Sequence, residues 1–385
     1  MQEQAHSVRA RNRFDRMEWA GAFGDLGTLI PFVVAYVSVV KVDPFGVLLS
    51  FGAALLICGL YYRTPFPVQP MKAIGAVAAT QAAQTATITP ATVYGASLVT
   101  GLVWLVLGLT GAARRLTSWA PRCVVIGIVL GLGFGFMLEG IKSMSSGWPV
   151  AGIALIGTLL LLTNRAVPAM FLLLLFGIVC GAVQRPELLR ELATVKAGLR
   201  LPDLALLRFT FHDLLIGTAF LALPQLPLTL GNAVIAIHEE NNRLFPDRPV
   251  TENGIAASTG LMNLASALFG GVPMCHGAGG MAGHVAFGAR TGGAPIILGT
   301  LLLLLALFCS GSIQVLFGLF APPVLGVILF LTGAQLALGS CDFSKQKGER
   351  FVTLATAAFA VWNVGLAFVL GVALTQIEKR GWLRL

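Results

Sequence analysis

Charged side chains are what this sequence has least of. Asp, Glu, Lys and Arg make up 11% of its 385 residues, against 56% for hydrophobic residues. Because soluble proteins are about 25% charged, this chain lacks the polar residues that would cover a surface facing water. Several apolar runs approach or reach the roughly 20 residues that span a bilayer, among them 94–111, 151–162, 169–183, 295–309 and 351–374. The composition excludes a soluble globular domain and predicts an all-α polytopic membrane protein.

Acidic residues are scarcer than basic ones, 17 against 26, which leaves a net charge of +9. Such a balance can indicate nucleic-acid binding, but no basic stretch of this chain is interleaved with aromatic residues. Cytoplasmic loops of membrane proteins also collect Lys and Arg, and that cause suits the composition better. We expect membrane lipid around the chain and no nucleic acid as a partner.

The cysteines give no sign of a disulfide framework or a metal site. None of the six forms a CxxC pair, and five lie in or beside apolar runs. No phosphate-binding loop is present either, so we expect no cofactor and no ATP drive within the chain. The polar N-terminal segment has no apolar core before Ala20, so we expect no cleaved signal peptide. The cysteines are Cys58, Cys123, Cys180, Cys275, Cys309 and Cys341.

An internal repeat covers most of the chain. Pro67-Val68-Gln69 resembles Pro273-Met274-Cys275, and each triplet follows an apolar span and precedes a short segment rich in Gly and Ala. Further matches join 121–135 to 322–335 and 91–112 to 294–311. The repeat predicts two halves, 20–183 and 212–378, joined by the connection 184–211.

Each half holds about seven expected spans. In the first half they are approximately 20–40, 45–62, 70–84, 90–111, 122–140, 148–163 and 167–183. In the second half they are approximately 212–238, 252–271, 275–288, 293–311, 322–339, 350–363 and 364–378, and the last two could also form one bent helix. Because an odd number of spans ends on the opposite side, the second half enters inverted, as in many secondary transporters.

Basic residues in the loops agree with this plan. With the N-terminal tail 1–19 in the cytoplasm, far more of the 26 Lys and Arg residues fall inside than outside. Most of the outer ones lie in the long connection 184–211, where 186–197 has the pattern of a short amphipathic helix. We therefore predict a multi-pass protein of the plasma (inner) membrane with both termini, 1–19 and 379–385, in the cytoplasm.

Segment 64–75, TPFPVQPMKAIG, interrupts the third span of the first half. Its three prolines cannot continue a helix, and non-helical backbone at membrane depth persists only inside protein or beside a wet cavity. A short helix can start after Pro70 and point its free N–H groups into the protein, ready for an anion. The alternative is a kinked helix that serves packing alone.

Segment 270–283, GGVPMCHGAGGMAG, is the symmetric partner of the first interruption. Pro273 breaks the span, and the glycines that follow allow close backbone approach. Gly-mediated helix packing would explain the glycines alone, but the pairing with 64–75 favours two facing half-helices.

Few ionisable residues lie deep in the spans. Asp25 and Lys72 are two, and such residues are costly in lipid and indicate function by default. Lys72 could attract an anion, and Asp25 could pair with it, carry a proton, or do both; a structural ion pair is the alternative. His276 could carry a proton near neutral pH or be a neutral hydrogen-bonding residue.

Uncharged polar residues complete the predicted site, because they can replace the hydration shell of an oxyanion. Thr28 lies in the first span, and the eighth span places further polar groups beside its prolines Pro224 and Pro227. The substrate-binding candidates are Asp25, Thr28, Gln69, Pro70, Met71, Lys72, Gln225, Thr229, Asn232, Cys275, His276 and Gly277, with Asp25 and His276 as candidates for proton coupling.

Four segments together resemble a known family. They are GDLGTLIPF at 24–32, PFPVQPMKAI at 65–74, ALPQLPLTLGNAV at 222–234 and GGVPMCHGAGGMAGHVAFGARTGG at 270–293. They are similar to the signature segments of the molybdate transporter family, which is related to the SulP sulfate permeases. The resemblance implies a core domain (20–111 and 212–311) and a gate domain (122–183 and 322–378), with substrate between two half-helices. SulP proteins often carry a C-terminal STAS domain, and we expect none here.

These observations predict a secondary active importer of a tetrahedral oxyanion, molybdate first and sulfate second, with protons as coupling ion. An anion channel and a nucleobase transporter of the same architecture are the alternatives, although the membrane glutamates of the latter are missing from the second half. An intramembrane enzyme would need Cys275 and His276 as a pair, but adjacent helical residues point about 100° apart. We expect no enzyme, and a homodimer is left open.

Overall fold

The computed structural model describes residues 11–72, 74–75, 88–117, 121–162, 164, 168–193, 198–202, 204, 210–338 and 344–380. In the first half of the chain its helices are α1 (Arg16–Ala22), η1 (Phe23–Asp25), α2 (Leu26–Ala35), η2 (Tyr36–Val40), α3 (Pro44–Tyr62), α5 (Pro90–Leu109), α6 (Ala112–Thr117), α7 (Arg122–Met144), α8 (Trp148–Leu161), α9 (Ala169–Gln184) and α10 (Glu187–Leu192). The described chain is helical apart from one pair of two-residue strands, β1 (Gln69–Pro70) and β2 (Met274–Cys275).

The second half of the described chain is also helical. Its helices are α11 (Phe211–Ile216), η4 (Gly217–Ala222), α12 (Leu223–Thr229), η5 (Leu230–Ala236), α13 (Ile237–Leu244), α14 (Glu252–Phe269), α15 (Ala278–Ala286), α16 (Gly293–Cys309), η6 (Ser310–Ser312), α17 (Ile313–Gly318), α18 (Pro322–Leu338), α19 (Lys347–Trp362) and α20 (Val364–Lys379). The expected all-α architecture is confirmed.

Several helices are long and apolar enough to cross a membrane. Among the described residues these are Arg16–Val40, Pro44–Tyr62, Pro90–Leu109, Arg122–Met144 and Gly293–Gly318, with shorter apolar helices beside them. Large apolar side chains stay on the outer surface, for example Leu160 and Val183, each 77% exposed. In water this would be an unusual cost, whereas lipid solvates such side chains.

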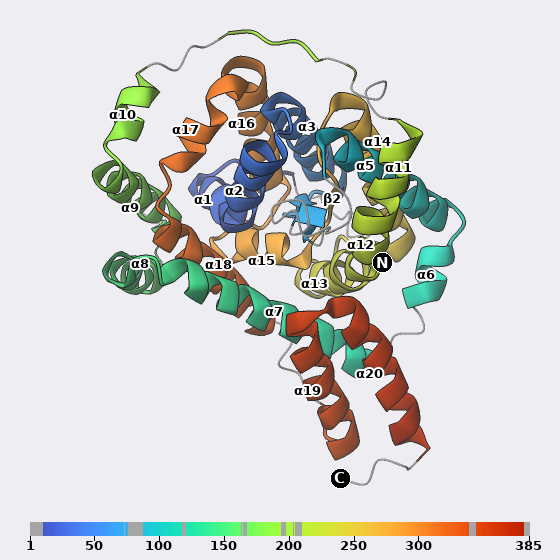
Figure 1. Cartoon of the computed structure of the whole chain (residues 1–385). Helices are drawn as coiled ribbons and strands as arrows, with labels where there is room; N and C mark the ends of the chain where they lie inside the picture. The colour runs from blue at the N-terminus through green and yellow to red at the C-terminus, as the bar shows by residue number, and fades with distance from the viewer. Residues whose placement is uncertain are drawn as a thin grey trace, which may run out of the picture.

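The helices form two groups, which Figure 1 shows side by side. In the first group α3 packs on α16 and α5 packs on α14. In the second group α7 packs on both α18 and α19, and α8 packs on α9 and α18. The two groups meet where α15 and α2 contact α18.

Reciprocal glycine contacts bring the helices of each group close together. A Cβ on Gly52 of α3 would lie 2.8 Å from the Gly299 carbonyl oxygen, and one on Gly299 would lie 2.7 Å from that of Gly52. Gly140 of α7 and Gly326 of α18 form the same kind of pair, at 2.7 Å in both directions. Only residues without a side chain allow backbones to approach this closely in a membrane.

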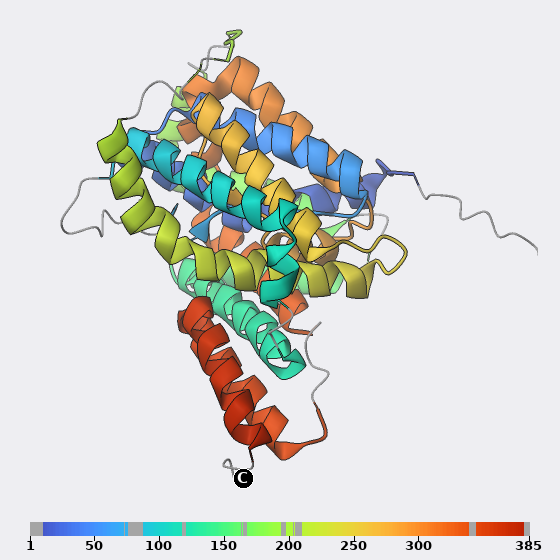
Figure 2. The same ribbon diagram turned by 90° about the vertical axis from the view of Figure 1, so that its right-hand side faces the viewer.

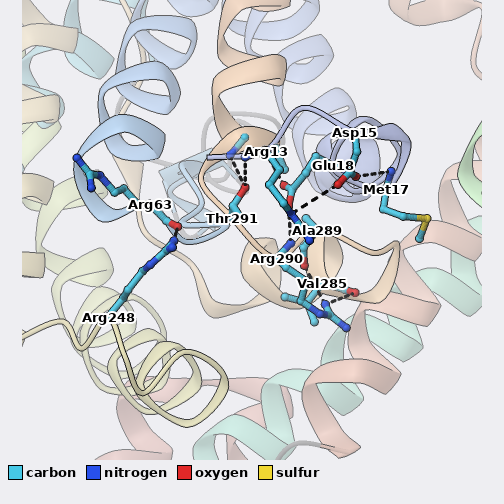
Figure 3. A network of polar contacts seen from close by, with 12 residues as sticks. Arg13, Asp15, Met17, Glu18, Arg63, Arg248, Val285, Ala289, Arg290 and Thr291 are labelled. Carbon is cyan, nitrogen blue, oxygen red and sulfur yellow. Dashed lines mark hydrogen bonds and ion pairs between the residues drawn. The ribbon is translucent and has the colours of Figure 1, made fainter. Parts of the chain in front are cut away.

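Left-handed residues end the two helices that precede the interruptions. Arg63 follows α3 with φ 57°, and Gly270 follows α14 with φ 71°. This conformation stops a helix and turns the chain, here back into the protein. The Arg63 carbonyl oxygen also accepts a hydrogen bond from the Arg248 guanidinium (Figure 3).

The two interruptions then cross as antiparallel strands at the centre of the first group, where β2 is seen in Figure 1. Gln69 pairs with Cys275, the residue that corresponds to it when the two Pro-containing triplets are aligned, and Pro70 pairs with Met274. Met71 continues the pairing by donating its N–H to the Pro273 oxygen at 2.9 Å. The similarity of the two Pro-containing triplets in the sequence therefore reflects a direct contact.

The last two expected spans form separate helices, which decides between the two arrangements that the sequence left open. The spans 350–363 and 364–378 are two separate helices, α19 and α20, that pack against each other. They lie side by side in Figure 1 and are the red helices at the bottom of Figure 2. The idea of one bent helix is wrong, because Asn363 leaves the helical conformation and caps α20 by accepting a hydrogen bond from Leu366 N–H. Helix α10 falls inside the predicted segment 186–197.

Some sequence predictions lie partly outside the described residues. Of the expected span 70–84, the structure describes only 70–72 and 74–75, and Lys72, Ile74 and Gly75 are helical there. Cys341 and the ends of both terminal tails also lie outside them.

The described part of the N-terminal segment is anchored to the turn between α15 and α16 (Figure 3). The buried Glu18 carboxylate accepts hydrogen bonds from Arg290 N–H at 2.9 Å and from Ala294 N–H at 3.1 Å, at the first turn of α16. Arg13 N–H donates to Thr291 Oγ1 at 3.1 Å. A carboxylate is favourable at this helix end because of the helix dipole.

The glycine contacts lead to a stability prediction. Gly299→Val inserts atoms where the α3 backbone lies, so we expect it to lower the stability by about 1–3 kcal/mol through overpacking. Gly157→Val is the matched control, since a Cβ on Gly157 meets nothing within 4 Å. Thermal unfolding in detergent, followed by size-exclusion chromatography, compares the two. Equal midpoints would contradict a packing role for Gly299.

Candidate functional site

The crossing brings three polar side chains together from different parts of the chain. Asp25 comes from η1, Gln69 from β1 and Asn232 from η5, and each is at most 2% exposed. Gln69 donates from Nε2 to Asp25 Oδ1 at 2.5 Å. A Cβ on Gly277 would lie 2.1 Å from Gln69 Oε1 and 3.1 Å from Asn232 Nδ2, so both amides face the backbone of Gly277.

Helix α15 begins at this point and aims its N-terminus at the three side chains. Gly277 is its N-cap residue and offers no side chain to the helix. A Cβ on Gly280, in the first turn, would lie 3.0 Å from Asp25 Oδ2. Free N–H groups and the helix dipole favour negative charge here. In the present arrangement Asp25 supplies it.

Lys72 provides positive charge close by. Its Nζ lies 3.5 Å from the centroid of the Phe136 ring, a cation–π contact, and within electrostatic range of Asp25 and Cys275. Within the described part of the chain, this buried ammonium nitrogen has no hydrogen-bond partner. An unpaired buried ammonium is costly, so the geometry favours an anionic ligand beside it.

Two acceptor oxygens of the site also lack partners. Gln69 Oε1 and Asn232 Oδ1 are buried and accept no hydrogen bond from any described residue. More than 90% of buried polar groups are normally paired, so unpaired atoms gathered at one place indicate room for a ligand or a rearrangement. An oxyanion satisfies the lysine but not these oxygens.

Polar residues of the eighth span contact two different parts of the site. Asn232 faces Gly277, whereas Gln225 accepts from Ile74 N–H at 3.4 Å and donates to Thr229 Oγ1 at 2.9 Å. Gln225 and Thr229 therefore lie at the start of the helix that follows Pro70. Met71 is fully buried beside the crossing, and Thr28 lies within hydrogen-bonding reach of Asp25.

His276 is held by groups beside the crossing. Its Nδ1 lies 2.8 Å from the Pro67 oxygen and its Nε2 lies 2.8 Å from Ser258 Oγ. The ring also packs edge-on against Phe66, with 4.9 Å between centroids. A neutral imidazole that donates from Nδ1 and accepts at Nε2 satisfies both contacts. The geometry thus favours the second sequence interpretation, a neutral hydrogen-bonding histidine that fixes the Pro67 backbone.

A cavity of about 800 Å³ connects Lys72 with the surface between the two helix groups. Thr28, Phe32 and Lys72 line it from the first group, and Phe136 lines it from α7. It extends to Glu139 and Lys142 near the end of α7 and to Asn363 between α19 and α20. Glu139 and Lys142 form an exposed ion pair with 2.6 Å between Nζ and Oε1.

Sequence reasoning missed the second wall of this cavity. The predicted topology places Lys142 among the outer loop charges and gives it no further role, and nothing in the pattern around Phe136 distinguishes that residue from a lipid-facing one. Glu139 and Lys142 are three residues apart, so they lie on one helix face and the sequence could have predicted their ion pair. It could not have predicted the cavity beside them.

Comparison with known families gives a match in both halves. The family model described as "Molybdate transporter of MFS superfamily" matches residues 17–136 and 217–336. Two curated relatives from Arabidopsis thaliana, molybdate transporter 2 and molybdate transporter 1, are each 30% identical to this chain. They cover 94% and 91% of this chain, and the matches span 87% and 85% of the relatives' own lengths. Molybdate transporter 1 of Chlamydomonas reinhardtii is 29% identical, over 94% of this chain and 92% of its own.

Solved structures share the fold at low identity. The transmembrane domain of a cyanobacterial bicarbonate transporter, BicA, matches with a TM-score of 0.55 and 17% identity, over 94% of this chain and 98% of its own. Murine solute carrier 26 family member A9, an anion transporter in the inward-facing state, matches with a TM-score of 0.61 and 11% identity, over 98% of this chain and 70% of its own. The expected likeness to SulP-type transporters is confirmed at the level of the fold.

The close contact at Gly277 can be tested without any ligand. Gly277→Ala places a methyl group on the Gln69 amide, and its φ of −67° suits alanine, so a loss of stability reports the contact and not backbone strain. We expect a loss of about 1–3 kcal/mol, partly relieved when Gln69→Ala is added. Thermal unfolding of the two single variants and the double variant measures this coupling. Strictly additive effects would show that the two residues do not touch.

Proposed function

The chain belongs to the molybdate transporter family, and from this premise we propose that it is a proton-coupled secondary transporter that carries molybdate and also accepts sulfate. Membership of the family makes it a multi-pass membrane transporter and not an enzyme. The names of the relatives support molybdate as the substrate, and sulfate shares its charge and tetrahedral shape.

In this proposal the chain forms a seven-plus-seven inverted repeat with both termini in the cytoplasm. Its core comprises 20–111 and 212–311, and its gate comprises 122–183 and 322–378. The symmetric crossing of β1 and β2 and the matching helix ends at Arg63 and Gly270 support the repeat. The separate packing of α3 with α16 and of α7 with α18 supports the division into core and gate.

One observation carries the assignment of the site: the buried Lys72 ammonium has no hydrogen-bond partner among the described residues, and Lys72 lines the inner part of the cavity together with Thr28 and Phe136. We place the anion between Lys72 and the first N–H groups of α15, beside Thr28, Gln69 and Asn232. Pro70, Met71, Cys275 and Gly277 shape the backbone there. Gln225 and Thr229 support the opposite half-helix.

The coupling proton resides on Asp25 in this proposal. Its carboxylate occupies the positive end of α15, where an incoming dianion competes with it. Protonation removes that competing charge, so anion and proton bind together. His276 keeps a positioning role, since a neutral ring satisfies both of its contacts.

The position of the cavity supports alternating access as the means of transport. It lies between core and gate and reaches the ends of α7 and α19, on the side that the loop charges assign to the exterior. Movement of the gate against the core would close this route and open one to the cytoplasm. The Glu139–Lys142 pair stands at its mouth.

The role of Lys72 is tested by its removal. Lys72→Ala takes away the buried positive charge, so we expect molybdate uptake into proteoliposomes to fall at least about ten-fold, the effect of losing one charged hydrogen bond. Lys347→Ala, at an exposed position on α19, is the control and should transport normally. Normal uptake by the Lys72 variant at low molybdate concentration would refute the charge role.

The role of Asp25 is tested by the dependence on a proton gradient. Asp25→Asn cannot bind or release the proton, so we expect it to lose accumulation driven by an acidic exterior while keeping exchange of labelled for unlabelled molybdate. Uptake and exchange are measured on the same proteoliposomes. Accumulation that still follows the gradient would assign the proton to another group.

A further inference from the structure

The Gln69 side chain lies between Asp25, the residue proposed to carry the proton, and the start of α15, where the anion is proposed to bind. Its Nε2 donates to Asp25 Oδ1 at 2.5 Å, and its Oε1 faces the Gly277 backbone at the start of α15. An ionised carboxylate can only accept hydrogen bonds, so it forces the NH₂ end of the amide toward Asp25. The carbonyl end must then point toward the place proposed for the anion.

This orientation opposes anion binding. Gln69 Oε1 is buried, has no donor among the described residues, and presents partial negative charge at the helix N-terminus. A buried acceptor without a partner is unfavourable in itself, and an anion beside it would be repelled. The ionised form of Asp25 therefore weakens the site through its own charge and through the amide that it orients.

Protonation of Asp25 reverses the preference of the amide. A proton taken from water and placed on Asp25 Oδ1 turns that oxygen into a donor, whose best partner is Gln69 Oε1. A half turn about the Cγ–Cδ bond of Gln69 puts the amide oxygen where the nitrogen was and the nitrogen where the oxygen was, while the carbon atoms stay in place. Gln69 Nε2 then offers its N–H groups beside the α15 N-terminus.

We propose that Gln69 is a proton-controlled switch, whose amide turns its carbonyl oxygen toward the anion position when Asp25 is ionised and its NH₂ group when Asp25 is protonated. Gln69 thus becomes the residue that converts the charge state of Asp25 into affinity for a tetrahedral dianion. The inference rests on the proposed function and adds the means of coupling.

The surroundings of Asp25 contain few other titratable groups. Lys72 and the Cys275 thiol face it. On α15, His284 lies one helical turn away, with Nδ1 2.8 Å from the Gly21 oxygen. On α1, Glu18 is already bonded to Arg290 N–H. Helices α2 and α18 carry no titratable residue. Asp25 is the acid in direct contact with the amide.

The test compares anion affinity in a slightly acidic and a slightly alkaline buffer. Isothermal titration of purified protein with molybdate and with sulfate gives both affinities, and the acid-to-alkaline ratio is the readout. Gln69→Met keeps the size of the side chain but removes both ends of the amide. We expect its affinity to fall at least about ten-fold in acid and little in alkali, so the ratio collapses by about that factor.

Asn232→Leu is the matched control. This substitution removes another buried amide that faces Gly277. Among the described residues, Gln69 donates a hydrogen bond to Asp25 and Asn232 does not. We expect it to weaken binding equally in both buffers and to leave the ratio at the wild-type value. Gln69→Leu repeats the measurement with a second apolar side chain, and thermal unfolding checks that each variant is folded.

The outcomes separate the switch from the proposed function. If the Gln69 variants keep the wild-type affinity in both buffers, Asp25 acts through charge alone and the switch is wrong. If they lose affinity equally in both buffers, Gln69 is an ordinary ligand and the switch is again wrong. If wild-type protein binds neither anion in either buffer, the proposed substrate itself fails. Asp25→Asn, which can donate to Gln69 Oε1, should bind in both buffers with the wild-type acid affinity and take up no proton.

Discussion

The backbone pairing of β1 with β2 is the constraint on which the rest of the structure depends. Non-helical chain within a membrane must satisfy its N–H and C=O groups inside the protein. Here Gln69 pairs with Cys275, Pro70 with Met274, and Met71 N–H with the Pro273 oxygen. Asn263 completes the arrangement, since its side chain bonds both the N–H and the oxygen of Met274 at 2.8 and 2.6 Å.

Everything at the site takes its place from this pairing. The short ladder sets Gln69 beside Asp25 and ends just before Gly277, so α15 starts where the carboxylate lies. The prolines that precluded a continuous helix also leave fewer backbone donors to satisfy. The backbone groups of the two interruptions are thus hydrogen-bonded to each other and to Asn263, while Gln69 Oε1 and Lys72 Nζ have no hydrogen-bond partner among the described residues.

The sequence predicted that the two interruptions belong together, but it predicted neither their pairing as strands nor the side-chain contacts around them. Similarity between the triplets at 67–69 and 273–275 was enough to pair the interruptions, and the register places Gln69 opposite its counterpart Cys275.

The direction of the His276 side chain could not be predicted, because neighbouring residues of an extended chain point to opposite faces. Cys275 lies near Lys72 and Asp25, while His276 contacts Ser258 and Pro67. The 2.5 Å contact of Gln69 with Asp25 joins residues far apart in the chain, and no local pattern encodes it. The break at Asn363, by contrast, was readable as a helix N-cap.

The anchoring of Glu18 has a consequence for the two ends of the chain. Because Glu18 and Arg13 bind the turn before α16, the described N-terminal residues belong to the same helix group as the crossing. The last described helix, α20, packs on α19 and α7 in the other group. Under the proposed movement Arg13 and α20 therefore belong to different moving parts, and two fluorophores attached beside them would change their separation with each transport cycle.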